Sequence, residues 1–177
     1  MHPIIYDVAV SIDGYISGPD GDISGFAHEG PVVDAYAARL QGYACALMGR
    51  ATYEFGYRFG LEPGQNPYPH LRSYVLSEGI SLPSSSEVTQ VTTSAASFVK
   101  DLRATASGPI YLCGGGALAG SLLQAGLIDV LRLKRAPILL AGGTRLFGSA
   151  PTARRLEHRE TQTYEGGYVF QEYHVKN

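Results

Sequence analysis

The sequence predicts an α/β protein with a mostly parallel central sheet, helices on both faces and a C-terminal antiparallel hairpin. Short apolar runs alternate with segments of helical periodicity, which is typical of parallel strands joined by helices. Two of these runs end in glycine, at Gly49 and Gly114, and lead directly into helical segments. Near the C-terminus, two strand-like segments flank Glu165-Gly166-Gly167, which is a hairpin signal. We expect residues 1–177 to form one domain, because this length is usual for one.

The composition limits the classes of protein to which the chain can belong. Hydrophobic residues make up 45% of the chain, which is enough for a substantial core, and a net charge of −2 argues against nucleic acid as a general partner. No apolar run approaches the roughly 20 residues that a membrane span needs, and no basic segment precedes an apolar core at the N-terminus. We therefore expect a soluble, cytoplasmic protein with no membrane contact. Cys45 and Cys113 lie in strand-like apolar runs, where reduced core thiols are usual.

The first strand and the loop after it set up the N-terminal part of the fold. Residues 4–10 are an apolar strand, and residues 11–26 form a long loop rich in glycine. Loops of this length inside a compact domain usually serve function. Asp20 and Asp22 approach calcium-loop spacing, but the other ligands are missing at the required offsets. We expect turn residues there and no metal site.

The remaining elements follow from periodicity and from capping signals. Apolar residues recur at helical spacing over residues 31–40, with Pro31 suited to the first turn. Ser94 is a natural N-cap for a helix over residues 94–104. A second apolar helix is expected over residues 117–127. Strands are expected at residues 43–48, 72–77, 88–92, 110–114, 127–133 continued by 137–140, 156–164 and 168–175.

The glycines at 114–116 open the first candidate binding site. Glycine lets the backbone adopt positive φ and lets another molecule approach the main chain closely. The free N–H groups of the following helical turn favour phosphate. Gly114, Gly116 and Ala119 satisfy the spacing of dinucleotide-binding turns, although a tight strand-to-helix connection without a ligand explains the same residues.

The segment GRATYE, residues 49–54, repeats this layout with a cation and a hydroxyl in the first turn. Arg50 and Thr52 suit a phosphate, and the alternative is a capped helix with a surface arginine. Two such turns in one small chain favour a shared ligand over either alternative. Because both turns follow parallel strands, they are expected at the same edge of the sheet.

The motifs together resemble a known family. SIDGYISG after the first strand, MGRATYE after the second, YVLS, and the long segment from IYLCGGGALAG to GGTRLF are similar to the dihydrofolate reductase-like superfamily. The nearest branch is the reductase domain of the riboflavin-biosynthesis deaminase-reductase. The resemblance spans nearly the whole chain and implies the three-layer fold of that superfamily. The zinc deaminase signature of the bifunctional enzyme is absent, which leaves a stand-alone reductase-like domain.

The resemblance implies NADPH as hydride donor and a set of residues that hold it. The glycine-rich first loop would close over the site as a lid. The implied residues fall into groups at the nicotinamide, at the adenosine-side phosphates, beside the adenine ribose, and around the pyrophosphate. They are, in that order, Ala9, Ile16 and Ser17; Gly49, Arg50, Ala51 and Thr52; Leu76 and Ser77; and Gly114, Gly115, Gly116, Ala117 and Leu118. Glu78 follows Ser77 where a basic or neutral residue would better suit a 2′-phosphate, so NADH stays an alternative donor.

On the substrate side the resemblance implies two candidate catalytic residues. Asp34 lies near the position of the carboxylate that grips the pterin in dihydrofolate reductases, or it is a plain exposed acid. Lys134 falls mid-strand where the superfamily faces the substrate, and could hold a phosphate or carboxylate there, or could point outward from a sheet edge. Asp13 in the lid is a third candidate or a turn residue.

Two function hypotheses remain, and one assembly is expected. The first is an NADPH-dependent reductase of a small heterocycle, pterin-like or ribosylaminopyrimidine-like. The second is a non-catalytic nucleotide-binding or assembly module that keeps the fold. The two intact glycine turns favour the reductase. A homodimer is expected from the resemblance and from the apolar, arginine-flanked segment 137–147.

Overall fold

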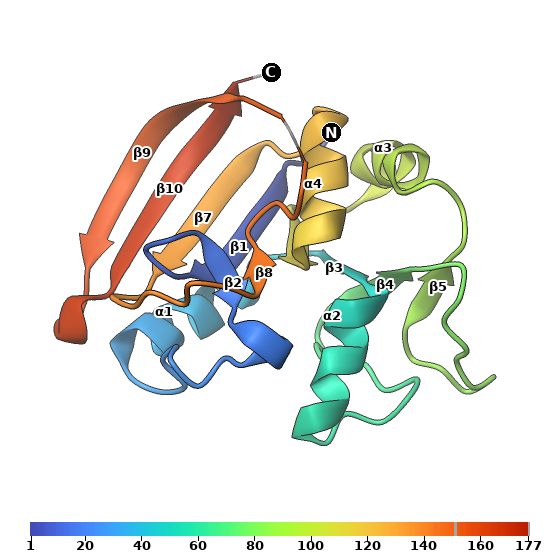
Figure 1. Cartoon of the computed structure of the whole chain (residues 1–177). Helices are drawn as coiled ribbons and strands as arrows, with labels where there is room; N and C mark the ends of the chain where they lie inside the picture. The colour runs from blue at the N-terminus through green and yellow to red at the C-terminus, as the bar shows by residue number, and fades with distance from the viewer. Residues whose placement is uncertain (151, 177) are drawn as a thin grey trace.

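The structure is a computed structural model and describes residues 1–150 and 152–176. Its centre is an eight-stranded sheet with the strand order β5-β4-β3-β6-β1-β7-β10-β9 (Figure 1). The strands are β1 (Ile4–Val10), β3 (Cys45–Gly49), β4 (Arg72–Leu76), β5 (Thr89–Val91), β6 (Ile110–Gly114), β7 (Val130–Arg135), β9 (Arg155–Thr163) and β10 (Val169–Lys176). The pairs from β5 across to β7 are parallel, and β10 runs antiparallel to both β7 and β9. The predicted fold class, a mostly parallel sheet with a C-terminal antiparallel hairpin, is confirmed.

Helices cover both faces of this sheet and enclose two apolar cores. The helices are α1 (Pro31–Leu40), α2 (Arg50–Phe55), α3 (Ala95–Thr105) and α4 (Gly116–Gln124), with short 3-10 turns η1 (Pro19–Gly21), η2 (Gly56–Phe59) and η3 (Glu165–Gly167). One core joins side chains of α3 and α4, including Val99 and Leu122, to Ile4, Leu47 and Leu112 of the sheet. The second core packs α1 and α2 against the opposite face. Figure 1 shows α4 in front of the sheet and α1 behind it.

The glycine-rich first loop is more ordered than a free loop. Its strand β2 (Tyr15–Ser17) pairs with the short strand β8 (Thr144–Arg145) in a separate two-stranded sheet. This pairing has no signal in the sequence, because the two strands are very short and lie far apart in the chain. The consequence is that the loop after β1 is held against the segment that follows residue 140.

Two predicted elements differ from the structure. Residues 137–140 do not continue β7, which ends at Arg135, since Pro137 has no N–H to give to a neighbouring strand. The helix that was expected to run to residue 127 ends at Gln124, and Gly126 follows with a φ of 66°. Among the described residues, no helix is long and apolar enough to cross a membrane.

Candidate functional site

A large cavity lies at the carboxyl ends of β3, β4 and β6 and has a volume of about 910 Å³. Nearly all of the residues that the sequence implicated in cofactor binding line it. They are Ile16, Ser17, Gly49, Arg50, Ala51, Thr52, Leu76, Ser77, Gly114, Gly115, Gly116, Ala117 and Leu118. The exception is Ala9, which lines a second cavity next to the first. The two glycine turns therefore lie at one edge of the sheet, as their place after parallel strands predicts.

The two turns touch each other, and the contact is tight at Gly115 and ordinary at Gly49. Gly49 ends β3 as the N-cap of α2, and Gly115 is the N-cap of α4. A Cβ atom on Gly115 would lie 3.0 Å from the Thr52 hydroxyl oxygen, and one on Gly49 would lie 3.8 Å from the Leu118 Cβ. Gly114 has a φ of 133°, a conformation that other residues rarely adopt. The result is a bare backbone cradle at the N-terminal end of α4, the kind of surface that phosphate groups approach closely.

Charged groups gather at the end of the large cavity next to α2. Arg50 donates from Nε to Glu54 at 2.8 Å and from a terminal nitrogen to the Gly79 carbonyl at 3.0 Å, and its side chain is 53% exposed. Glu78 also lines this end of the cavity. The Arg50 guanidinium is thus positioned beside the strand end that carries Ser77.

Sequence reasoning missed several residues that line the large cavity. Arg58 donates a 2.7 Å hydrogen bond to the Asp20 carbonyl and stacks on Phe55, so it joins η2 to the first loop. Nothing in the residue pattern marked it. Thr93 and Ser94 line the cavity at the start of α3. In the described part of the chain, the Ser94 side chain makes no capping hydrogen bond to α3, although Ser94 occupies the predicted N-cap position. The helix start predicted at Ser94 is the one sequence signal that could have indicated that this residue lies at the cavity.

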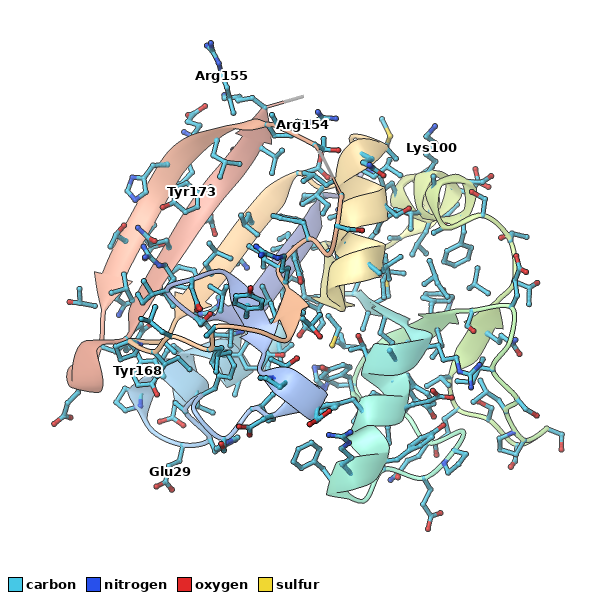
Figure 2. The ribbon with its side chains drawn as sticks, viewed as in Figure 1. Glu29, Lys100, Arg154, Arg155, Tyr168 and Tyr173 are labelled. Carbon is cyan, nitrogen blue, oxygen red and sulfur yellow. The ribbon has the colours of Figure 1, made fainter. Side chains whose placement is uncertain are left out.

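The small cavity adjoins the large one and has a volume of about 400 Å³. Val8 and Cys113 line both cavities, so the two spaces share a wall on β1 and β6. The remaining lining is largely aromatic and apolar. It comprises Phe26, Ala27, His28, Val32, Val33, Tyr36, Tyr68, Tyr111 and Tyr168, together with Asp7, Ala9 and Lys134. Tyr168 lies where the C-terminal hairpin turns beside α1 (Figure 2).

A buried ion pair forms the floor of the small cavity. The Lys134 ammonium donates to an Asp7 carboxylate oxygen at 2.9 Å and lies 3.5 Å from the centre of the Tyr36 ring. Arg39 reaches the same carboxylate from α1 at 2.9 Å, and the Tyr43 hydroxyl donates to it at 3.1 Å. The Asp7 side chain is fully buried, and the Lys134 side chain is 11% exposed. Lys134 therefore points into the molecule and not outward from the sheet edge, and Asp7 is a site residue that sequence reasoning missed.

The pKa values of this pair follow from burial and from the neighbouring charges. Burial alone would raise the pKa of Asp7, but the Lys134 and Arg39 cations and their hydrogen bonds hold it below its usual value. Burial lowers the pKa of Lys134, while the Asp7 carboxylate opposes that shift. The carboxylate is thus held ionised by two cations.

Three tyrosines and a cysteine supply further polar groups to the small cavity. The Tyr36 and Tyr111 hydroxyls share a hydrogen bond of 2.5 Å, and the Tyr68 hydroxyl lies 3.1 Å from the Cys113 sulfur. Burial is the main cause that raises the pKa of each of these four groups. They therefore stay protonated at neutral pH and can donate hydrogen bonds. Cys113 is a free thiol, as is the buried Cys45.

The other two candidate acids lie outside the small cavity. Asp34 is exposed in the first turn of α1 and lines neither cavity, although Val32 and Val33 beside it do. Asp13 accepts hydrogen bonds from the Ser11 hydroxyl at 2.6 Å and from the Leu140 and Ala141 backbone N–H groups, and these lower its pKa to about 2. It binds two loops together, which corresponds to the turn role and not to contact with a substrate.

The parallel sheet, its terminal hairpin and the glycine turns at one sheet edge define a dihydrofolate reductase-like fold. Dihydrofolate reductase from Enterococcus faecalis, in a complex with NADP(H), has this fold, with a TM-score of 0.69 and 17% identity over 99% of this chain and 97% of that chain.

The chain belongs to the RibD C-terminal domain family, whose model matches residues 3–170. A putative riboflavin biosynthesis protein from Shewanella sp. PV-4 is similar in structure, with a TM-score of 0.82 and 24% identity, and each chain is covered fully. The uncharacterized protein YyaP of Bacillus subtilis (strain 168) is 24% identical over 179 residues, which cover 97% of this chain and 94% of that protein.

Proposed function

We propose that the protein is an NADPH-dependent reductase that transfers hydride to a small heterocyclic substrate, pterin-like or ribosylaminopyrimidine-like in size. The observation that carries the proposal is the pair of adjoining cavities. The larger one has a backbone cradle for phosphates, and the smaller one is aromatic. They share the wall formed by Val8 and Cys113. A donor in one cavity and an acceptor in the other would meet at that wall.

The residues of the large cavity fit a dinucleotide. The bare turn at Gly114 and Gly115 would leave the pyrophosphate free to approach the N-terminal end of α4, since side chains are absent there. Thr52 would donate its hydroxyl, and Arg50 would contribute charge at the adenosine end. When bound, the nicotinamide supplies the hydride, so that the protein contributes alignment and exclusion of water.

Lys134 is the proposed polar group on the substrate side. Its ammonium is fixed by Asp7 and by the Tyr36 ring, and its remaining N–H bonds are available to the cavity. In that position it would orient a ring oxygen or nitrogen and oppose the charge that develops there during hydride transfer. Asp34 has no such place in the proposal, because it lines neither cavity.

Cofactor binding is tested by titrating the purified protein with NADPH and with NADH and following nicotinamide fluorescence. We expect saturable binding of NADPH. Gly115→Ala should weaken it at least tenfold, because the added methyl group would lie about 3.0 Å from the Thr52 hydroxyl. Gly42→Ala is the matched control, since Gly42 follows α1 and lines neither cavity. Absence of binding by either cofactor would overturn the proposal and favour the non-catalytic module.

A further inference from the structure

The polar groups of the small cavity restrict the substrate of the proposed reductase further. We infer that the cavity takes a planar ring whose polar edge carries carbonyl oxygens, and that this ring bears no phosphate group. The inference deepens the proposed function and rests on it only for the identity of the small cavity as the substrate site. It follows from two observations. The first is which hydrogen-bonding groups line the cavity, and the second is which of these groups already have partners within the protein.

The cavity offers donors. The Lys134 ammonium carries three N–H bonds, of which one is directed to Asp7. The hydroxyl groups of Tyr36 and Tyr68 and the thiol of Cys113 lie in the same lining and remain protonated, but each is already hydrogen-bonded within the protein, and the hydroxyl oxygens can accept as well as donate. The Lys134 N–H bonds can only donate, and they pair with carbonyl oxygens or with ring nitrogens that carry a lone pair. A ligand edge made of amino groups would face them with N–H against N–H.

The carboxylate that could accept from an amino-substituted ring is already satisfied. Asp7 accepts from Lys134 at 2.9 Å, from Arg39 at 2.9 and 3.4 Å, and from Tyr43 at 3.1 Å. A carboxylate has about four acceptor sites, so these contacts fill them. Of the described residues that line the cavity, Asp7 alone is acidic. Among the described lining residues, an aminopyrimidine edge therefore finds no free carboxylate, only tyrosine hydroxyls that are already hydrogen-bonded within the protein.

The cavity also provides no site for a phosphate. Of the described residues that line it, Lys134 alone is Lys or Arg, and it shares the buried Asp7 carboxylate with Arg39, which does not line the cavity. His28 lines the cavity too, but it is exposed to solvent, where a charge contributes little. A phosphate near neutral pH carries close to two negative charges and is usually held by several donors.

The start of α1 does not supply those donors either. Pro31 has no N–H, and the N–H groups of Val33 and Asp34 already bond to the Gly30 carbonyl at 2.9 and 3.0 Å, which leaves the single N–H of Val32 in this turn. The Asp34 carboxylate in the same turn repels an anion. The end of the helix that approaches the small cavity thus offers one backbone donor beside a carboxylate, whereas an anion site needs several donors and no like charge.

The walls fit a flat ring. Tyr68 and Tyr111 pack edge to face with 5.6 Å between ring centres, and Tyr36 and Tyr111 do so at 6.4 Å. Phe26 and Val32 are buried on the same lining. A cavity of about 400 Å³ lies in the usual range for small-molecule sites and takes a ring system of one or two rings.

The test compares two pteridines that differ at one position. Lumazine carries two ring carbonyls, and pterin carries an amino group in place of one of them. Their affinities are measured for the wild-type protein by fluorescence titration, with and without saturating NADPH. We expect lumazine to bind at least tenfold more tightly than pterin. Equal affinities, tighter binding of pterin, or no binding of either would overturn the inference.

Two further experiments test which group causes the preference for lumazine and whether the cavity excludes a phosphate. Lys134→Met should remove most of the preference for lumazine, whereas Lys100→Met, at an exposed lysine of α3 that lines neither cavity, should leave it unchanged. For the phosphate, 5-amino-6-ribitylaminouracil is compared with its 5′-phosphate, and the phosphate-free compound should bind more tightly. Tighter binding of the phosphate would overturn that part. NADPH is titrated separately, so a protein that selects lumazine but binds no NADPH would refute the proposed reductase and leave the ring preference standing.

Discussion

At the residue scale, the ion pair of Asp7 with Lys134 shows how the register between two strands determines which side chains meet at a site. Asp7 pairs with Arg132 in the sheet, and Ala9 pairs with Lys134. Asp7 and Lys134 are therefore diagonal neighbours on the same face of β1 and β7, within reach of a long side chain. The sequence indicated Lys134 as a candidate but did not determine whether its side chain points into the molecule or outward from the sheet edge. Asp7 stood in an apolar run with no motif around it, so only the register could reveal it.

Removing Asp7 should destabilise the fold strongly. Asp7→Asn leaves the Lys134 ammonium buried without its counter-charge, and we expect a loss of about 3–5 kcal/mol in the free energy of unfolding. The measurement is chemical denaturation. In a double-mutant cycle, Lys134→Met added to Asp7→Asn should cost much less than the sum of the two single changes. Additive losses would show that the two side chains do not act as a pair.

The same pair predicts a pH dependence with a defined sign. The pKa of Asp7 is lower in the folded protein than in the unfolded chain. Its stabilising contribution is therefore fully present above the unfolded value near 4 and is lost as the pH falls toward the folded value. The difference in stability between the wild type and Asp7→Asn should thus shrink below about pH 4. Denaturation curves across this range test it.

Arg50 and Glu78 should act in opposite directions on the choice of cofactor. Arg50→Ala should weaken NADPH binding by about 1.5–3 kcal/mol and NADH binding by less, because only NADPH carries a 2′-phosphate. Glu78→Gln should strengthen NADPH binding selectively, and added salt should reduce the gain. Both are read from titrations at low and high salt. If Arg50→Ala leaves the NADPH affinity unchanged, the phosphate assignment of this turn fails.

At the scale of elements, Asp13 joins the first loop to the segment after β7. Its carboxylate accepts from the Leu140 and Ala141 N–H groups, and the Leu146 N–H donates to the Gly14 carbonyl at 3.0 Å. Together with the pairing of β2 and β8, these bonds hold a loop that the sequence analysis treated only as a flexible lid. The loop has a fixed partner on one side and faces the large cavity through Ile16 and Ser17.

Asp13→Asn should loosen this connection without unfolding the sheet. An amide keeps the shape of the side chain but loses the charge that strengthens three of its hydrogen bonds. Hydrogen exchange should become faster at the amides of Leu140 and Ala141, with little change at β1 and β6. Asp22→Asn is the matched control, because that carboxylate accepts only locally, from the Ser24 N–H. Unchanged exchange at residues 140–141 would contradict the role given to Asp13.

Elements with a local signal could be predicted, and those that depend on distant partners could not. The helix over residues 31–40 has the predicted bounds, because Pro31 and the apolar spacing lie within it. The strand expected at residues 88–92 is present as β5, with three residues. β2 and β8 have too few residues to carry periodicity, and their existence depends on each other. Residues 137–140 read as apolar and extended, yet they pair with no strand of the central sheet.

At the scale of the whole molecule, the lining of the large cavity was more predictable than that of the small cavity. Glycine turns after parallel strands meet at one sheet edge whatever the details of packing, so the two turns could be located in advance, and the family resemblance supplied the full sets Gly49–Thr52 and Gly114–Leu118. The small cavity instead gathers single side chains from β1, α1, β6, β7 and the loops. Tyr68 and Phe26 come from irregular segments, where no spacing rule applies.

The homodimer remains a prediction, and the structure narrows where to test it. In segment 137–147, Leu146 and Phe147 pack against the core, whereas Leu139 is 72% exposed. Leu139→Glu should therefore shift the protein toward monomer in light scattering across a range of concentrations. Phe59→Glu is the matched control, since Phe59 is also an exposed large apolar side chain but lies on η2. A wild-type protein that is monomeric throughout would refute the dimer.

The central place of β1 also determines the order in which the sheet can form. β1 lies between β6 and β7, and Ile4 pairs with Ile110 while Ile5 pairs with Val130. During synthesis, both edges of β1 therefore stay unpaired until most of the chain has left the ribosome. An unpaired apolar strand is a template for association with other chains, and sheets built from distant segments fold slowly. We therefore expect association of the nascent chain to be greatest before the segments of β6 and β7 emerge and pair with β1.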